Sequence, residues 1–467
     1  MLHNVGTGRD YQTVSDSSGA YSLTFIPIGN YEVSAQAVGF KKATFTTFTL
    51  IVNDKRRVDF NLEVGQVTET LTVNADLALV NTANGTTSAV VTNEQLINLP
   101  STARGVLPFA LLMPGAVSTT PTSATANNTS VNGIRPTHNA WMLDGGYDID
   151  TGGNWGVLLA PNMEIVEEVR AIRGNYSSEF GTGGGSQFNA ITKSGTNQIH
   201  GSAYEFLRNS AMNARSYFQP TLPVLKNNEY GFTIGGPVVI PKLYNGRNRT
   251  FFFANIDWNP LRSQTQFLDK LPEAGYRNGD FSGLGKIITD PQTGAPFPGN
   301  MIPASRIDPN AAIYVKQYPT TNFRDSIGDN YAVNQPQIQN VHQYTARVDH
   351  NFSDKYRLMG RWTANHSDNN YFVATEPGYN FLRRDDIADV NHLVIDQTSS
   401  LRSNLINDFN FVRVHNRLEY FPNSLNPASG IKIPLYFPVT SQSYPLANLN
   451  LSAIPQRVPG ISLVNYS

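Results

Sequence analysis

The sequence predicts a mostly β protein in three consecutive parts. Short alternating apolar runs separated by turn residues occupy residues 1–64 and predict a small β-sandwich. Within residues 65–197 the candidate strands are short, glycine and asparagine break them, and short helical segments accompany them, which predicts a small α/β unit. From 198 to 467 the alternation extends over much longer stretches, as in antiparallel strands of a large sheet. We expect these three ranges to be the domains of the chain.

Composition narrows the class of protein. Of the 467 residues, 15% are charged and the formal net charge is -1, so no basic face for nucleic acid is predicted. The absence of cysteine excludes disulfides, thiolate metal sites and a cysteine nucleophile. The most apolar stretch, Gly105 to Val117, is broken by two prolines and is shorter than the ~20 residues of a spanning helix. An aromatic share of 11% suits a membrane β-barrel and a soluble β-rich surface protein equally well.

The first 64 residues predict strands on both sides of a tight turn. Tyr21 to Phe25 alternates, Pro27 to Asn30 reads as a turn, and Tyr31 to Ala37 keeps one apolar face. Val58 to Val64 alternates again and predicts another strand. We expect the core of this unit to include Tyr21, Leu23, Phe25, Tyr31, Val33 and Phe60.

The same segment resembles the carboxypeptidase regulatory-like domain, which is a transthyretin-like sandwich. The resemblance rests on Gly19-x-Tyr21, on Phe25-x-Pro27-x-Gly29-x-Tyr31, and on Gly39-Phe40. It implies strands ahead of Gly19, and only part of them fits before that residue. We therefore expect the domain to be cut at its front and a signal peptide to be lost with it. Peptidase activity is not expected, because no HExxH motif or other catalytic set is present.

The stretch that follows predicts one more strand and two short helices. Gln66 to Ala75 alternates, and Thr92 with Gln95 forms a capping-box pattern for a helix that must end near Leu99, because Pro100 follows. Arg104 to Met113 is a second helical candidate, stopped by Pro114-Gly115. Ser118 to Ser130 reads as a loop.

Residues 131–209 carry the most distinctive pattern. Val169 to Ile172 and Phe188 to Thr192 read as short strands on either side of a glycine cluster at Phe180 to Ser186, where backbones can approach closely. Gln198 to Asn209 then predicts a long strand in which Tyr204 and Phe206 alternate with polar or aliphatic neighbours. We expect Thr192 to Asn197 to be the turn between the two kinds of structure.

This stretch resembles the plug of TonB-dependent outer-membrane transporters and its exit into the first strand of the barrel. The most specific piece is Thr192 to Asn197 followed by His200-Gly201, which resembles the Oar-like branch of the family. The other matching pieces are Asn132 to Arg135, Leu143 to Gly145, Ile165 to Gly174 and Glu179 to Gly181. The resemblance implies a structural or gating role for a set of plug residues: Asn132, Gly133, Arg135, Asp144, Gly145, Arg173, Gly174, Phe180, Gly181, Thr192, Lys193, Ser194, Gly195, Thr196, Asn197 and Gly201.

The hairpin from Tyr344 to Thr363 is the clearest signature of a membrane barrel. Two alternating runs flank a tight turn at Ser353 to Lys355. Phe252 to Trp258, earlier in the chain, shows the same alternation in a single run. The alternation predicts that Tyr344, Ala346, Val348, Leu358 and Trp362 face lipid, and that Arg347, Asp349, Arg357 and Arg361 face the lumen.

A long segment interrupts the predicted strands. Leu271 to Pro336 is rich in proline, glycine and aspartate without regular period, and we place it outside the cell, where outer-membrane barrels carry their long loops. Barrels of the family have about 22 strands, which need ~220 residues at roughly ten each, whereas only about eight strands fit after residue 197. We therefore expect an incomplete antiparallel transmembrane β-barrel, in a chain that lacks both ends.

No catalytic or metal site is predicted. Asp144, Asp148 and Asp150 miss the EF-hand spacing and suit turns better than calcium, and the scattered histidines show no metal spacing. Gly181-x-Gly183 lacks the third glycine of a dinucleotide fingerprint. Three plug arginines could meet substrate or pair with acids of the barrel wall, and pairing is the favoured interpretation: these are Arg135, Arg170 and Arg173. We expect no enzyme activity and no cofactor.

The resemblance implies an outer-membrane receptor, with its N-terminal domain in the periplasm, that binds a surface ligand and imports it by energy-coupled rearrangement of the plug. The implied partners are outer-membrane lipid, an inner-membrane energy-transducing complex reached through a periplasmic segment, and an unidentified peptide, oligosaccharide or metal chelate. No energy-coupling box is evident in the sequence. Two alternatives remain: an adhesion or matrix-interaction protein without transport, and a secreted carbohydrate-binding or hydrolytic β-protein.

Overall fold

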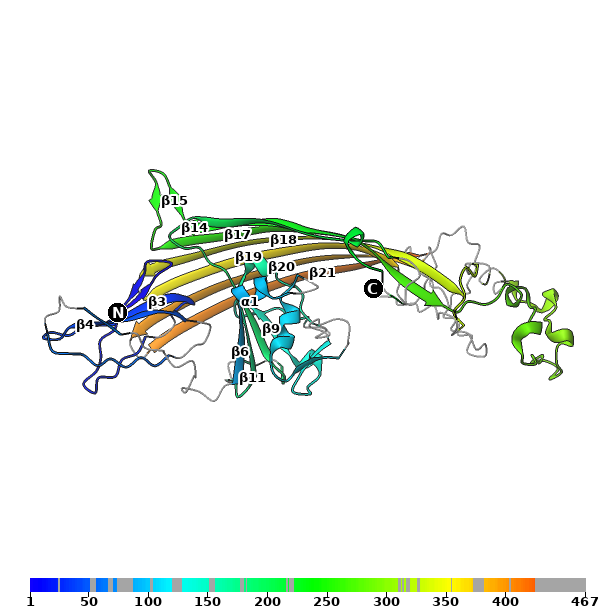
Figure 1. Ribbon diagram of the computed structural model, residues 1–467, viewed down its shortest axis with the longest axis horizontal. Helices are drawn as coiled ribbons and strands as arrows, with labels where there is room; N and C mark the ends of the chain where they lie inside the picture. The colour runs from blue at the N-terminus through cyan, green and yellow to red at the C-terminus, as the bar shows by residue number, and fades with distance from the viewer. Residues whose placement is uncertain are drawn as a thin grey trace.

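The computed structural model of the chain places the three predicted parts side by side (Figure 1). It describes residues 1–23, 26–50, 56–65, 70–73, 87–100, 104–119, 128–150, 156–176, 180–181, 183–215, 217, 222–309, 312, 315, 320–325, 328–353, 355–372, 382–402 and 405–424. Within these residues no helix is long and apolar enough to cross a membrane.

The N-terminal part is a five-stranded sheet with the order β2-β1-β3-β4-β5. Its strands are β1 (Leu2–Asn4), β2 (Asp10–Tyr11), β3 (Gly29–Ala35), β4 (Lys42–Leu50) and β5 (Thr70–Val73). Neighbouring strands are antiparallel except β4 and β5, which are parallel. The buried core consists of Leu2, Tyr31, Val33 and Phe45, and the partly buried Leu23 and Phe60 pack against it.

Three details of this sheet differ from the sequence prediction. Tyr21 to Leu23 is not a strand, and Tyr21 is 38% exposed because its hydroxyl reaches out to donate to the carbonyl of Val58, 2.7 Å away. Val58 to Val64 is also not a ladder strand: it makes one bridge, between Val64 and Phe40, and otherwise contributes side chains. Leu2, which was not among the expected core residues, is buried in this core. Phe25 lies outside the described residues, and of Gln66 to Ala75 only β5 is described.

The second part, called the plug here, spans Thr87 to Thr192. Its main sheet has the order β10-β9-β12-β11-β6, with β9 and β12 parallel and the other pairs antiparallel. The elements are β6 (Thr87–Thr92), α1 (Asn93–Asn98), η1 (Leu107–Leu112), β7 (Ala116–Ser118), β8 (Thr129–Val131), η3 (Pro136–His138), β9 (Ala140–Leu143), β10 (Gly146–Tyr147), η4 (Met163–Ile165), β11 (Val166–Gly174) and β12 (Gln187–Thr192).

Both predicted helical segments of the plug are present, in shorter form. Thr92 and Gln95 make the reciprocal capping box at the start of α1, and Leu99 ends the helix ahead of Pro100. The second segment is the 3-10 helix η1. Leu96 of α1 and Phe109 of η1 are buried in the same core as Val169 of the sheet. Both helical segments therefore pack against the sheet.

The third part, called the wall here, is a curved seven-stranded sheet in which each strand pairs with the next along the chain. Its strands are β13 (His200–Asn209), β14 (Leu225–Pro237), β17 (Thr250–Asp269), β18 (Tyr331–Ser353), β19 (Tyr356–Phe372), β20 (Leu382–Arg402) and β21 (Leu405–Ser424), with the short η5 (Ser210–Met212) after β13. All six pairs are antiparallel, and the plug lies on the concave side (Figure 1). The sheet does not close into a barrel. A small hairpin, β15 (Val239–Ile240) and β16 (Tyr244–Asn245), stands between β14 and β17.

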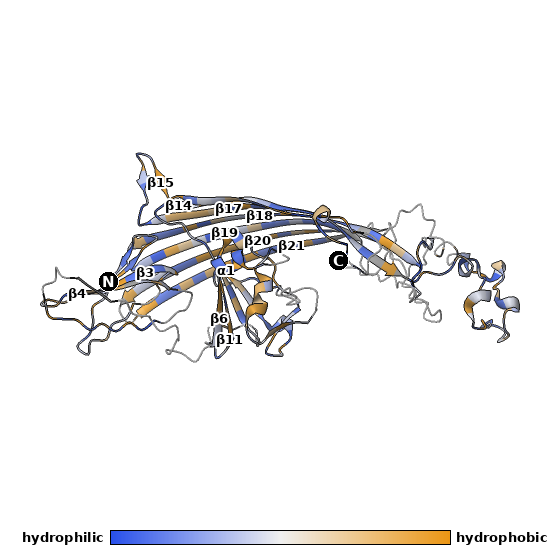
Figure 2. Cartoon of the chain, in the orientation of Figure 1, coloured by the Kyte–Doolittle hydropathy of each residue, from blue (hydrophilic) through white to orange (hydrophobic). Residues whose placement is uncertain are grey.

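Apolar and polar residues are interspersed along every strand of the wall (Figure 2). Because successive side chains point to opposite faces, the two faces of the wall differ in chemistry. The convex face carries exposed apolar side chains such as Val348 and Trp362. Tyr230 stacks on Trp258 at one edge of this apolar band, with ring centroids 5.6 Å apart, and Phe352 marks the other edge. Along β18 the band covers about 10 residues, which matches the roughly 9–11 residues of a transmembrane strand.

The segment between β17 and β18 is shorter than predicted. Leu271 to Pro336 was expected to be irregular, but β18 begins at Tyr331, because Tyr331 to Pro336 continue the ladder opposite Gln264 to Asp269. The two strands therefore extend well beyond the apolar band. Short 3-10 turns occur in the remaining segment: η6 (Tyr276–Asn278), η7 (Ser282–Leu284), η8 (Pro298–Asn300) and η9 (Ala304–Arg306).

Candidate functional site

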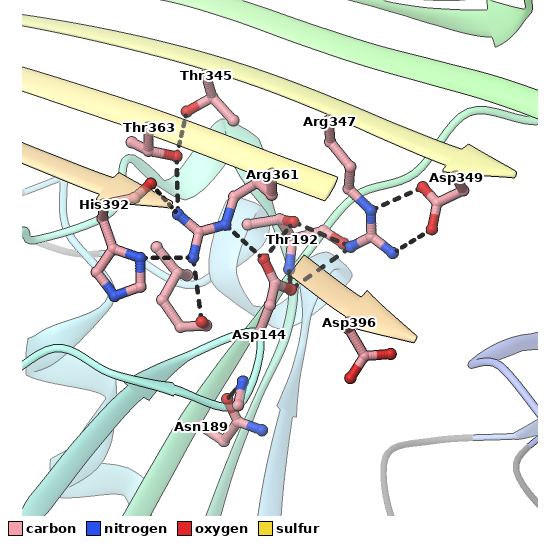
Figure 3. A network of polar contacts seen from close by, with 12 residues as sticks. Asp144, Asn189, Thr192, Thr345, Arg347, Asp349, Arg361, Thr363, His392 and Asp396 are labelled. Carbon is pink, nitrogen blue, oxygen red and sulfur yellow. Dashed lines mark hydrogen bonds and ion pairs between the residues drawn. The ribbon is translucent and has the colours of Figure 1, made fainter. Parts of the chain in front are cut away.

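Asp144 sits at the tip of the β9–β10 hairpin and points at the wall (Figure 3). Leu143 pairs with Gly146, and the two residues between them have positive φ, 51° for Asp144 and 76° for Gly145. Two successive positive φ angles define a type I′ turn, for which Asp-Gly is a preferred sequence. The turn chemistry expected from the sequence is therefore what presents the carboxylate to the wall.

Arg361 of β19 binds this carboxylate from the wall side. Its side chain is 0% exposed, and its Nε donates to Oδ2 of Asp144 at 2.8 Å. A terminal nitrogen donates to the carbonyl of Leu143 at 3.1 Å, and the same nitrogen lies 2.9 Å from Nδ1 of His392 on β20. The other terminal nitrogen donates to Oγ1 of Thr363 at 3.2 Å. A fully buried guanidinium thus joins two wall strands to the plug hairpin.

Arg347 of β18 holds the end of β12. It donates to the carbonyl oxygen of Thr192 at 2.7 Å and to Oγ1 of Thr192 at 3.0 Å, and it lies 3.5 Å from Oδ1 of Asp144. Its other two nitrogens bind Asp349 bidentately, at 2.8 and 2.9 Å. Asp144, Asp349, Arg347 and Arg361 together balance two negative and two positive charges in a water-poor junction.

Thr192 completes the set of donors around Asp144. Its backbone N–H and its hydroxyl each donate to the carboxylate at 2.9 Å. Burial alone would raise the pKa of Asp144, but Arg361, Arg347 and the Thr192 donors outweigh it and hold the pKa below its ordinary value. The carboxylate is therefore ionised and fully engaged by cations and donors of the protein itself.

A second polar junction lies toward β13 and β14. Arg104 of the plug bonds to Glu164 of the plug at 2.7 Å and to Glu229 of the wall at 3.1 Å, and its guanidinium lies 3.3 Å from the ring centroid of Phe206. Asn162 donates to the same oxygen of Glu229 at 3.3 Å. Plug and wall are thus joined at two separate charged points.

The structure shows other contacts for the three predicted arginines. Arg135 is exposed, Arg170 donates to Ser88 at 3.2 Å, and Arg173 donates to the carbonyl of Pro114, which are contacts within the plug. Arg104 is a plug arginine that pairs with a wall acid, Glu229. At Asp144 the charges are the other way round: the acid belongs to the plug, and the arginines belong to the wall. Arg170 and Arg173 lie on β11, which is flanked by β6 and β12 in the plug sheet.

Two of the predicted plug motifs pack within the plug itself. Asn132 and Gly133 form another turn with positive φ, 52° and 76°, and the amide of Asn132 donates to the carbonyl of Arg173 at 3.3 Å. This contact ties the turn to the end of β11. Phe180 lies edge-on to Tyr176, with ring centroids 6.4 Å apart.

The close backbone approach expected in the glycine cluster occurs at Gly183 and Gly185 within it. Nothing lies within 4 Å of a Cβ built on Gly174 or Gly181. A Cβ on Gly183 would meet the carbonyl of His138 at 2.7 Å, and one on Gly185 would meet the side chain of Asn139 at 2.6 Å. The glycine requirement therefore lies beside η3.

The segment Thr192 to Asn197 is where the three parts of the chain meet. The N–H of Lys193 donates to the carbonyl of Ile165 at 2.8 Å, and burial lowers the pKa of its amine. A Cβ on Gly195 would collide with Gly236 of the wall, and one on Gly201 would collide with the carbonyl of Thr233. The hydroxyls of Ser194 and Thr196 stay local, donating to the carbonyls of Gly195 and Gln198.

Asn197 connects this segment to the N-terminal sheet. Its N–H donates to the carbonyl of Gly6 at 3.1 Å, and its side-chain amide donates to Thr7 and to Asn248. Arg9 donates to the carbonyl of Ser353 at the β18–β19 turn. One loop of the N-terminal sheet therefore contacts the plug exit and two turns at the same rim of the wall.

Comparison with known proteins identifies the wall. The family described as "Outer membrane beta barrel domain" matches residues 191–461, which is more than half of the chain. The chain belongs to this family. Residues 1–63 match the family described as "Carboxypeptidase regulatory-like domain". The barrel-domain match, together with an outer-membrane transporter relative, places the protein in the outer membrane.

One curated relative is the TonB-dependent transporter Oar of Myxococcus xanthus, with 26% identity over 252 residues. The match covers 50% of this chain and 23% of the relative, so the chain spans less than a quarter of that protein's length. Among solved structures, the outer membrane transporter YddB from Escherichia coli has a TM-score of 0.41 at 12% identity, over 67% of this chain and 37% of that one. The siderophore receptor PirA from Acinetobacter baumannii has a TM-score of 0.37 at 14% identity, over 70% and 43%.

Proposed function

We propose that this protein is a TonB-dependent outer-membrane receptor of the Oar type, which binds a ligand at the cell surface and imports it by energy-coupled rearrangement of the plug. The observation that carries the proposal is the charged junction of Asp144 with Arg347 and Arg361. A polar junction can be taken apart in a water-filled lumen, because water can replace each of its hydrogen bonds, whereas an apolar seal has no such replacement. The name of the relative adds support, since it describes a TonB-dependent transporter.

The same proposal assigns roles to the three parts. We propose that residues 1–64 form a periplasmic domain, that 65–197 form the plug, and that 198–467 belong to the barrel with an extracellular segment near 271–336. In this division an inner-membrane energy-transducing complex acts from the periplasmic side, and the ligand, a peptide, an oligosaccharide or a metal chelate, meets the opposite side. The contacts of Asn197 with the N-terminal loop support a common rim for the periplasmic elements.

The energy-coupled rearrangement of the plug can be tested by chemical labelling of a wall residue that the plug covers. Val394 of β20 is 0% exposed and lies against Gly146 of the plug. We expect a Val394→Cys variant of the complete protein to react with a membrane-impermeant maleimide in energised cells and to react more slowly after a protonophore collapses the proton gradient. Gln292→Cys, in the exposed segment between β17 and β18, is the control and should react equally in both states. Identical slow labelling of Val394→Cys in both states would contradict transport.

The segment between β17 and β18 favours a second candidate, adhesion without transport. Arg306 bonds bidentately to Asp290 at 2.9 Å, and Asn330 donates to the carbonyl of Leu271, so this outer segment has a folded surface of its own. An adhesion protein would show energy-independent labelling of Val394→Cys together with loss of cell attachment on deletion of the gene. A transporter would show energy-dependent labelling and unchanged attachment.

A further inference from the structure

The β15–β16 hairpin takes no part in the plug junctions or in the barrel ladder described above, yet its backbone is regularly hydrogen-bonded. Val239 pairs with Asn245 and Ile240 pairs with Tyr244, and the N–H of Leu243 closes the turn on the carbonyl of Ile240 at 3.0 Å. At its base, the N–H of Val238 donates to the carbonyl of Thr250 at 2.9 Å. The segment between β14 and β17 is therefore a hydrogen-bonded hairpin that projects from the wall.

The hairpin stands on the convex face of the wall. Side chains on β17 alternate, with Phe251 and Phe253 buried on the plug side, so Thr250 belongs to the opposite face. The hydroxyl of Tyr244 bonds to Oγ1 of Thr250, and Thr250 in turn lies 2.7 Å from Nδ1 of His350. Figure 1 shows the hairpin on the side of the sheet away from the plug.

Its tip is apolar and exposed. Leu243 is 80% exposed, and Val239 and Ile240 are each about half exposed, at 48% and 47%. The base of the hairpin lies next to the Phe352 edge of the apolar band, because Thr250 pairs with His350. If the hairpin projected into water, its three aliphatic side chains would form an exposed apolar patch, which is unfavourable.

The charge of the hairpin is one-sided. Residues 238–250 contain three basic residues and no acidic one, and Lys242, Arg247 and Arg249 are all exposed. Basic and aromatic residues beside an apolar surface are typical of segments that lie at the membrane interface, where the cations meet anionic headgroups. The hairpin also lies at the depth expected for the membrane interface. Its base at Thr250 is opposite His350, two residues from Phe352 at the edge of the apolar band.

We infer that the β15–β16 hairpin is a membrane-interface anchor: its aliphatic tip enters the periplasmic leaflet of the outer membrane, and its cations bind phospholipid headgroups there. The occupant of this surface is lipid, because the base of the hairpin lies next to the lipid-facing band of the wall and the hairpin carries charge opposite to anionic headgroups. The anchor would hold the wall, and the N-terminal loop that Asn197 and Asn248 contact, at a constant depth in the bilayer.

Spin labels in the complete protein, reconstituted without any energy source, test the depth of the tip. Leu243→Cys carries the label, Val348→Cys is the lipid-exposed reference, and Gln292→Cys is the aqueous reference. We expect the label at 243 to collide more with oxygen than with a water-soluble nickel chelate, as the label at 348 does. Greater collision with the chelate would overturn the inference, and so would protection from both reagents, because it would show that protein covers the tip.

A charge series tests the headgroup contact. The triple variant Lys242→Gln, Arg247→Gln, Arg249→Gln is compared with Lys286→Gln, an exposed lysine of the outer segment. In vesicles containing phosphatidylglycerol, the label at 243 should lie deeper than in purely zwitterionic vesicles, and only the triple variant should lose this difference. A difference that persists in the triple variant would overturn the role of the cations. The spin-label results do not depend on whether Val394→Cys labelling is energy-dependent. The membrane anchor and the transport function can therefore fail independently of each other.

Discussion

At the scale of single residues, one carboxylate lies at the centre of the charged junction between the plug and strands β18 to β20. Asp144 accepts hydrogen bonds from Thr192 and from Arg361 and lies beside Arg347, all within a buried junction. Buried charges of this kind stabilise a structure only as a complete set, because any member left alone is a desolvated charge. The junction is therefore sensitive to single substitutions.

Asp144→Asn should loosen the plug strongly. Neutralising the carboxylate leaves Arg361 buried without its counter-ion, and breaking a buried pair in this way costs about 3–5 kcal/mol. Hydrogen exchange of the amides in β9 and β10 measures the local opening. The matched control is Asp59→Asn, whose pair with Arg57 is highly exposed and contributes about 0–1 kcal/mol. Equal exchange rates in the two variants would contradict the proposed role of Asp144.

The pH dependence of plug stability should have two opposite limbs. The pKa of Asp144 is lowered, so its contribution is present above the unfolded value of ~3.9 and is lost as the pH falls through the folded pKa. Burial raises the pKa of Asp148, so stability falls as the pH rises from ~3.9 through that folded pKa. Asp148→Asn keeps the side-chain oxygen that accepts from Leu159 and should remove the second limb only.

The stacked rings of Trp141 and Phe188, with centroids 4.1 Å apart inside the plug, provide the signal for this measurement. The urea midpoint of their near-ultraviolet circular dichroism, followed between pH 3 and pH 7, reports plug unfolding. Asp144→Asn should lose the acid limb, and Asp148→Asn should lose the limb above it. Wild-type profiles in both variants would show that neither carboxylate is linked to plug stability.

At the scale of elements, the β18–β19 hairpin separates membrane assembly from plug docking. Its predicted alternation is confirmed: Val348 and Trp362 are exposed on the convex face, and Arg347 and Arg361 are largely buried on the plug side. Arg347 also holds Thr192 and Asp349, so the lumen-facing side of this hairpin contributes to plug docking.

Two substitutions at adjacent positions should therefore fail in different ways. Val348→Arg places a cation on the lipid face, at a cost of roughly 2–4 kcal/mol near the midplane, and should reduce assembly into the outer membrane. Arg347→Val should assemble normally but increase maleimide labelling of Val394→Cys, because the plug is held less tightly. Heat-modifiable gel mobility measures assembly of the complete protein. Loss of assembly in both variants would contradict the separation.

At the scale of the whole molecule, the N-terminal sheet, the plug exit and the wall converge on one rim. Asn197 binds Gly6 and Asn248, and Arg9 binds the carbonyl of Ser353. Among the described residues these contacts are hydrogen bonds, so we expect the N-terminal sheet to be attached but separable.

Limited proteolysis of the complete protein tests this attachment. Cleavage between about 64 and 90 should yield a folded N-terminal piece that stays with the barrel on size-exclusion chromatography. Asn197→Ala combined with Arg9→Ala should release that piece, because both substitutions remove contacts to the rim. Arg57→Ala, which alters an exposed pair within the N-terminal part, should not release it. A piece that dissociates equally from all variants would show that the rim contacts do not hold it.

Much of the architecture could be predicted from local chemistry. The capping box at Thr92 and Gln95, the Asp-Gly turn at Asp144 and the alternation around Val348 each depend on residues close in sequence, and each is observed. The misassigned strand at Tyr21 shows the limit: alternation there reflects ring packing over Phe60, with centroids 6.2 Å apart, rather than ladder pairing. Periodicity alone does not distinguish the two, because both place every second side chain on one face.

The sequence by itself determined the capped start of α1, the Asp144-Gly145 turn and which face of the β18–β19 hairpin is charged, because backbone geometry and side-chain period are local properties. Only the tertiary structure decided that Asp144 pairs with Arg347 and Arg361, that Arg104 rather than Arg135, Arg170 or Arg173 reaches a wall acid, and that a basic hairpin stands on the convex face. Those partners are separated by more than 100 residues along the chain. Long-range pairs depend on how the plug docks in the curved wall, and no local pattern specifies that docking.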